Sequence, residues 1–193
     1  MILDYELNEK QREAVTARDG AVLVLSGAGS GKTRVITYRT SYLIESGVSP
    51  EEILTVTFTN KAAREMKNRI VKLVGDDSIS GKLSISTFHS MCLNILVKNL
   101  EHLGYSDDLV IYDGEDQDRL ISSIVDDLDY DKQNFDARNI RNYISKMKLR
   151  LKRPQDIKTS NSFERKRVAI YKEYRKKMFL RNAMDFSDLI FNT

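Results

Sequence analysis

The feature that most constrains the fold of this chain is an apolar run followed directly by a glycine-rich loop. The run, residues 21–25, contains no polar side chain, which is typical of a strand buried on both faces of a parallel sheet. A helical pattern follows the loop from Lys32 to about Ser46, and Gly47 ends it. A strand, a glycine-rich turn and a helix in this order predict an α/β architecture built on parallel strands.

The loop has the composition of a phosphate-binding site. Its glycines let the backbone fold into a nest of N–H donors, and the N-terminus of the following helix adds its positive dipole end. Lys32 can reach the β- and γ-phosphates of a nucleotide, and the Thr33 hydroxyl can ligate Mg²⁺. The usual pattern opens with glycine where this chain has Ser26, and the alternative is a glycine-rich turn with a solvated lysine. The predicted nucleoside triphosphate site consists of Ser26, Gly27, Ala28, Gly29, Ser30, Gly31, Lys32 and Thr33.

Two polar side chains near this loop can select the base of the nucleotide. Gln11 precedes the apolar run, and its amide offers one donor and one acceptor to the edge of adenine. Arg34 follows the loop directly, and its planar guanidinium can stack on a purine. Taken alone, each is more often a surface residue, so the pattern leaves both interpretations open.

The rest of the chain divides into an α/β part and a helical part. Residues 53–58 form a β-branched and apolar run, residues 83–87 are a third short strand candidate, and helical patterns follow them over 61–74 and 88–103. Short turns between alternating strands and helices predict a parallel sheet with helices on both faces. After Gly104 only long helical patterns are predicted, over 115–128, 137–152 and 162–181. The expected domains are an α/β core over 1–104, an all-helical domain over 105–184, and a return to the core over 185–193.

The net charge of +3 conceals two blocks of opposite sign. Residues 105–136 contain 2 basic and 11 acidic side chains, whereas residues 137–182 contain 16 basic and 3 acidic ones. The basic block can attract a polyanion, or the acidic block beside it can neutralise it internally. A charged helical face is also often merely solvated.

Composition excludes several classes of protein. The single cysteine, Cys92, rules out a disulfide framework, and with only His89 and His102 beside it the sequence argues against a Cys/His zinc site. No apolar run is long enough to cross a bilayer, and no signal peptide begins the chain. We therefore expect a soluble, cytoplasmic protein.

Five motifs stand in one order along the chain. They are Leu7-Asn8-x-x-Gln11, Gly27-Ala28-Gly29-Ser30-Gly31-Lys32-Thr33-Arg34, Thr57-Phe58-Thr59-Asn60-Lys61-Ala62-Ala63-x-x-Met66, Ser86-Thr87-Phe88-His89-Ser90 and Met184-Asp185-Phe186-Ser187-Asp188-Leu189-Ile190. Together they resemble the N-terminal part of a UvrD/Rep/PcrA-type ATP-dependent DNA helicase. Serine or alanine is common in that family at the position of Ser26.

The resemblance implies a RecA-like P-loop core with a helical insertion, and it assigns roles by position. Gln11 would contact adenine, Arg34 would pack on it, and Lys32 and Thr33 would serve catalysis by binding the phosphates of ATP and Mg²⁺. The basic helices would face duplex DNA. Single-stranded DNA would be met by Thr57, Phe58, Thr59, Asn60, Thr87, Phe88, His89 and Phe186.

The resemblance also implies a parent protein that translocates on single-stranded DNA and unwinds duplex, in DNA repair or replication. Its partners would be single-stranded and duplex DNA and the C-terminal helicase domains of the same polypeptide. For some of the assigned residues, structural roles remain open. Phe58 can be a core residue at a strand end, Asn60 can cap the next helix, and His89 can be a buried or helix-capping residue.

Hydrolysis of ATP requires one carboxylate that binds Mg²⁺ and another that orients water, usually at the end of an apolar strand. The strands expected in the α/β half are not followed by such residues. Residues 109–112 form an apolar run that ends in Asp113, so a self-contained small P-loop ATPase or kinase using Asp113 or Asp116 is one alternative. We interpret Asp113 instead as a turn residue that opens the acidic helix. The catalytic carboxylates and a second motor domain are then expected outside this sequence, which would leave the chain inactive alone. A nucleic-acid-binding module with a vestigial phosphate loop is a further alternative.

Overall fold

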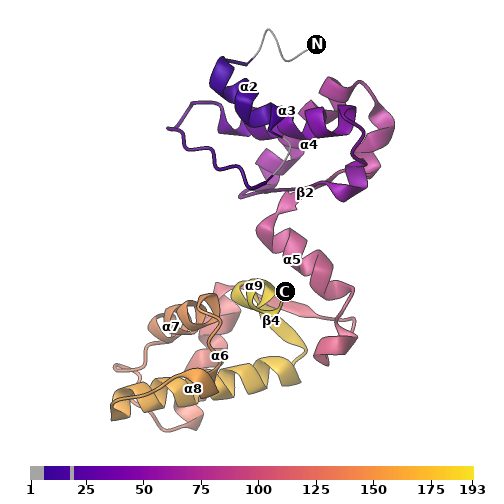
Figure 1. Ribbon diagram of the computed structural model, residues 1–193. Helices are drawn as coiled ribbons and strands as arrows, with labels where there is room; N and C mark the ends of the chain where they lie inside the picture. Colours follow the sequence, from indigo (N-terminus) through magenta and orange to yellow (C-terminus); the bar gives the residue numbers. More distant parts are fainter. Residues whose placement is uncertain (1–6, 18–19) are drawn as a thin grey trace. The chain divides into compact units, whose positions relative to one another are not determined.

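The computed structural model describes residues 7–17 and 20–193, which form a mixed α/β structure with short parallel strands and many helices (Figure 1). The chain divides into two compact units, one up to Phe88 and the other from His89 onward. Among the described residues, no helix combines the length and the apolar character needed to cross a membrane.

Apart from the strand expected over residues 21–25, the first unit follows the predicted order of elements. Its helices and strands are α2 (Glu9–Thr16), α3 (Lys32–Glu45), η1 (Pro50–Glu52), β1 (Leu54–Thr57), α4 (Asn60–Val74), η2 (Asp77–Gly81) and β2 (Ser84–Thr87). Local chemistry sets their ends. The Thr59 hydroxyl caps α4 by accepting a hydrogen bond from the backbone N–H of Ala62, and Gly75 ends α4 in the left-handed conformation. The helices predicted after the glycine-rich loop and over 61–74 are thus confirmed.

Strands β1 and β2 form a parallel pair whose register runs from Leu54 opposite Ser84 to Thr57 opposite Thr87. The two strands therefore end side by side, and the chain continues from each of them into a helix, α4 or α5 (Phe88–Val97). Helices α2, α3 and α4 pack in sequence. Their apolar faces contribute to two clusters of buried residues. These clusters include Val15, Val35 and Tyr38 in one, and Met66, Ile70, Ile79 and Leu83 in the other.

The prediction of a buried strand over residues 21–25 is wrong for this structure. The segment belongs to no strand, and Leu23 and Leu25 are 81% and 84% exposed. A strand buried on both faces needs hydrogen-bonded neighbours on its edges and helices over its faces. In the described residues of the first unit, the only strand pair is β1 with β2, and the apolar run pairs with neither strand.

The second unit contains the predicted long helices and two further strands. Its elements are α5, which begins at Phe88, then η3 (Glu101–Leu103), β3 (Val110–Tyr112), α6 (Gly114–Asp127), α7 (Ala137–Leu149), η4 (Pro154–Asp156), α8 (Ser162–Leu180), β4 (Ala183–Asp185) and α9 (Phe186–Asn192). Helices α6, α7 and α8 pack against one another (Figure 1). Their core includes Ile121, Ile124, Ile144, Ile170 and Tyr171.

The second unit also contains a strand that was not predicted from the sequence. Strand β4 pairs in parallel with β3, so that Val110 lies opposite Ala183. The unit begins at His89 and therefore includes α5 after its first residue. The reason is packing, because Leu96 and Leu100 are buried against Met184 and Leu189 and therefore join α5 to the second unit.

Candidate nucleotide and nucleic-acid sites

The glycine-rich loop leads directly into the N-terminus of α3. Gly31 is the N-cap of this helix and has φ 88°, a left-handed conformation that favours glycine. A Cβ atom there would also lie 2.9 Å from Nε2 of Gln11. The Lys32 ammonium folds back over the loop and donates to the carbonyl oxygens of Ser26 (3.1 Å) and Gly27 (2.5 Å). The loop, the helix terminus and the cation therefore lie together, as the sequence predicts.

Gln11 lies against this loop although 19 residues separate it from Ser30. Its Nε2 donates to the Ser30 carbonyl oxygen at 3.0 Å. Its Oε1 accepts a hydrogen bond from the backbone N–H of Asn8 at 3.1 Å. The Oδ1 of Asn8 in turn accepts one from the backbone N–H of Gln11, so the two residues form the capping box of α2. The cap therefore fixes Gln11 beside the loop.

A cavity of about 510 Å³ opens between the loop and α4. It is lined by Asn8, Gln11, Gly29, Ser30, Gly31, Arg34 and Arg69. Arg34 and Arg69 also line a neighbouring hollow of about 320 Å³ together with Lys72 and Tyr38. The positive charge of these side chains and the N-terminus of α3 favour an anionic ligand such as a nucleotide.

Arg69 lines this cavity but was not among the site residues predicted from the sequence. The signal that could have found it is helical spacing, because Arg69 and Lys72 are three residues apart on α4 and therefore share a face. Met66 and Ile70 are buried, which leaves Arg69 on the exposed side of the helix. Only the packing of α4 beside α3 places that side next to the loop.

A metal ion in this site would depend on oxygen ligands from the loop. Among the described residues, no three His, Cys, Asp or Glu side chains come together as a metal site. The side chain of Thr33 is exposed at the start of α3, so its hydroxyl, which the loop pattern assigns to Mg²⁺, is accessible to a ligand.

The ends of β1 and β2 present two aromatic rings. Phe58 is 90% exposed, which shows that it is not a core residue, and Phe88 is 42% exposed. Their ring centroids lie 6.0 Å apart. The paired strand ends, Thr57 and Thr87, precede them. The structure therefore brings the predicted Thr57, Phe58, Thr59, Asn60, Thr87 and Phe88 to one end of the strand pair.

The structure excludes a helix cap at Asn60 and a buried side chain at His89. Asn60 does not cap α4, because that role falls to Thr59, and it is the first residue of the helix. His89 is exposed, which excludes a buried histidine. Its ring meets Phe186 edge-on in the second unit, with centroids 5.8 Å apart and an interplanar angle of 80°. Phe186 is itself 51% exposed.

Asp113 opens the acidic helix, as the sequence analysis expects. It is the N-cap of α6, and its Oδ1 accepts from the backbone N–H groups of Glu115 (2.8 Å) and Asp116 (3.0 Å). The backbone hydrogen bond from Asp116 is the largest cause that holds the pKa of the Asp113 carboxyl below its ordinary value. This carboxylate is committed to a helix cap.

Replacing Asp113 with alanine is therefore expected to leave Mg²⁺–ATP binding unchanged and to cause a small loss of thermal stability. The physical reason is that the variant removes a cap and no phosphate or metal contact. Isothermal titration with Mg²⁺–ATP, together with a thermal melt, checks both parts. A weaker nucleotide affinity would favour the small-ATPase alternative.

The basic block is partly neutralised by the acidic one. Arg141 pairs with Asp118 at 3.1 Å, and Lys177 pairs with Asp127 at 2.5 Å. Lys148 is 1% exposed, so it does not belong to a solvated face. An exposed basic set remains on or near α7 and α8, namely Arg138, Lys146, Arg150, Lys152, Arg153, Lys158, Arg165, Lys166, Lys172, Lys176 and Arg181. Part of the block is therefore neutralised internally, and the exposed basic set is accessible to solvent or to a polyanion.

Comparison with known proteins gives one consistent result. The model of the UvrD/REP helicase N-terminal domain matches residues 7–193. Relatives described as ATP-dependent DNA helicase PcrA, from Staphylococcus epidermidis and Staphylococcus aureus, are each 42% identical over 190 residues. These alignments cover 97% of this chain and 26% of each relative, so the chain spans about a quarter of their length.

Proposed function

This chain belongs to the UvrD/REP helicase N-terminal domain family, and from that premise we propose that it is the ATP- and DNA-binding part of an ATP-dependent DNA helicase. The parent protein translocates on single-stranded DNA and unwinds duplex in repair or replication. The observation that carries the proposal is the loop at the N-terminus of α3, where Gln11 and Arg34 line one cavity, and Gln11 and Lys32 line a second hollow beside it.

In the proposed site, ATP lies with its phosphates on the loop. The backbone N–H groups at the start of α3 hold the β-phosphate, and Lys32 leaves the carbonyl oxygens of the loop to pair with the β- and γ-phosphates. Thr33 would provide a hydroxyl to Mg²⁺, and the bound ion would supply positive charge to the phosphates. Gln11 and Arg34 bind adenine, and Arg69, on α4, adds a cation to the lining of the same cavity.

In the proposed architecture, residues 1–104 form part of a RecA-like core and 105–184 the helical insertion, with 185–193 returning to the core. The carboxylates that orient water and complete the Mg²⁺ site then belong to regions that correspond to the parts of the relatives outside the alignment with this chain. Under this assignment, the chain binds ATP and DNA but does not hydrolyse ATP.

Single-stranded DNA is proposed to contact the exposed aromatic residues. Phe58 and Phe88 offer stacking faces at the carboxyl ends of β1 and β2, the end of a parallel sheet at which ligands bind. Thr57, Thr59, Asn60 and Thr87 supply polar groups around them. Phe186 and His89 provide a second aromatic pair in the helical unit, and the exposed basic set suits the phosphates of duplex DNA.

Replacing Phe58 with alanine tests the DNA-binding half of the proposal. Stacking on one aromatic ring is worth about 1–3 kcal/mol, so the variant is expected to bind oligo-dT roughly 5- to 150-fold more weakly. Fluorescence anisotropy at fixed salt measures the affinity. Leu54→Ala is the matched control, because Leu54 lies at the opposite end of the same strand and is 56% exposed. Equal affinities for Phe58→Ala and the native chain would contradict the assignment.

A further inference from the structure

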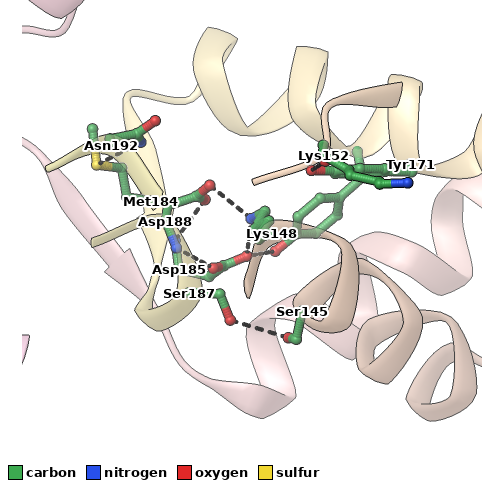
Figure 2. A network of polar contacts seen from close by, with 10 residues as sticks. Ser145, Lys148, Lys152, Tyr171, Met184, Asp185, Ser187, Asp188 and Asn192 are labelled. Carbon is green, nitrogen blue, oxygen red and sulfur yellow. Dashed lines mark hydrogen bonds and ion pairs between the residues drawn. The ribbon is translucent and has the colours of Figure 1, made fainter. Parts of the chain in front are cut away.

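A buried polar network connects α7, α8 and the first turn of α9 (Figure 2). Lys148 lies at its centre, and its ammonium is 2.6 Å from Oδ2 of Asp185 and 2.8 Å from Oδ1 of Asp188. The hydroxyl of Tyr174, on α8, donates to the same Oδ2 of Asp185 at 2.8 Å. Lys148, Tyr174 and Asp185 are each 1% exposed or less. One cation therefore serves two carboxylates in the interior.

The two carboxylates are also the capping box of α9. Asp185 accepts from the backbone N–H of Asp188 at 2.9 Å, and Asp188 accepts from that of Asp185 at 3.1 Å. Each aspartate thus uses one oxygen for the cap and the other for Lys148. Burial raises the pKa of Asp188, and the Lys148 charge opposes that shift. The ammonium therefore binds the cap itself.

Helix α9 depends on this cap because it is short. It contains seven residues, fewer than an isolated helix needs for stability in water. Phe186 and Ser187 occupy the turn between the two aspartates, and the Ser187 hydroxyl lies 3.1 Å from that of Ser145 on α7 (Figure 2). Contacts from α7 therefore hold both sides of the turn that presents Phe186 to His89.

We propose that Lys148 is a positioning residue that fixes the Phe186 ring edge-on to His89 by binding both carboxylates of the α9 cap. The inference rests on the proposed function, because it assigns this aromatic pair to single-stranded DNA. Lys148 touches no base in this proposal. It holds the first turn of α9 so that Phe186 stays half-exposed in one orientation for stacking.

The test uses the two histidines of the chain as spectroscopic probes. The ring current of Phe186 shifts the imidazole proton resonances of His89 and leaves those of His102 as an internal reference. In Lys148→Met we expect the His89 resonances to move in the same direction as they do in Phe186→Ala. We also expect about a five-fold or greater loss of oligo-dT affinity, the lower limit for one stacked base. Lys98→Met is the matched control, because Lys98 is an exposed lysine of the same unit that lies outside the exposed basic set, and it should change neither readout.

Tyr174→Phe covers the case in which Lys148→Met does not fold. This variant removes only the hydroxyl that donates to Asp185 and keeps the buried ring, so we expect a smaller His89 shift in the same direction. Native His89 resonances in a folded Lys148→Met chain would overturn the proposal, as would native resonances in Tyr174→Phe if that is the only variant that folds.

The same variants separate this inference from the proposed function. If Phe186→Ala binds oligo-dT as tightly as the native chain, the DNA contact at Phe186 is wrong. The His89 resonances of Lys148→Met then still decide whether Lys148 positions the ring. If Phe186→Ala weakens DNA binding while a folded Lys148→Met chain keeps both native readouts, the DNA contact stands and the positioning role is wrong.

Discussion

Replacing Lys32 with alanine is expected to weaken Mg²⁺–ATP binding by roughly 10- to 150-fold. Hydrogen bonds to charged groups are worth about 1.5–3 kcal/mol, and the variant removes the only loop side chain that carries a charge to the phosphates. The folded chain should persist, because Lys32 is exposed and its bonds go to carbonyl oxygens of the loop. Isothermal titration measures the affinity, and Lys82→Ala, another exposed lysine of the same unit, serves as the control.

Steady-state hydrolysis, with and without single-stranded DNA, extends this test. We expect no turnover by the native chain above that of Lys32→Ala, because the carboxylates that orient water are assigned to parts of the relatives that the chain does not span. Turnover that depends on Lys32 would contradict that assignment. An unchanged affinity in Lys32→Ala would instead favour the alternative of a vestigial phosphate loop.

Sequence analysis located helices well because their ends are set by nearby residues. The caps at Asn8 and Asp113 and the left-handed Gly75 stand within or next to the helices that they terminate. The glycine-rich loop is equally local, since its glycine, lysine and threonine residues adjoin the helix that completes the site. Such features need no knowledge of distant parts of the chain.

The predictions that failed depend on partners far away in sequence. Residues 21–25 are apolar enough for a buried strand, but burial requires neighbouring strands, and the described residues do not provide them. Strand β4 has three residues, too few for a period to be detected, and it exists by pairing with Val110. Arg69 reaches the cavity beside the glycine-rich loop only through the packing of α4 on α3.

Lys148 gives the clearest example of this limit. A lysine among other basic residues predicts a solvated side chain, yet Lys148 is one of the most buried residues of the second unit. Its position on α7 matches the apolar face formed by Ile140, Ile144 and Met147, and that spacing was the available signal. The carboxylates that stabilise it lie 37 residues or more further along the chain.

Replacing Asp185 with alanine is expected to lower the free energy of unfolding of the helical unit by about 3–5 kcal/mol, the usual cost of removing one partner from a buried ion pair. Asp185 accepts hydrogen bonds from Lys148, Tyr174 and the backbone of Asp188. Its loss leaves the Tyr174 hydroxyl without that acceptor and Lys148 with one carboxylate in place of two. Urea denaturation followed by circular dichroism measures the change.

Asp113→Ala is the matched control, because the chain contains the same local motif twice. Asp113 with Asp116, and Asp185 with Asp188, are both Asp-x-x-Asp capping boxes at a helix start. The first box is exposed, whereas the second is buried around Lys148. The smaller loss of stability expected for Asp113→Ala therefore measures the contribution of the cap alone. The difference between the two variants measures the contribution of the buried network. Equal losses would mean that capping accounts for the whole effect and that the buried ammonium adds no net stability.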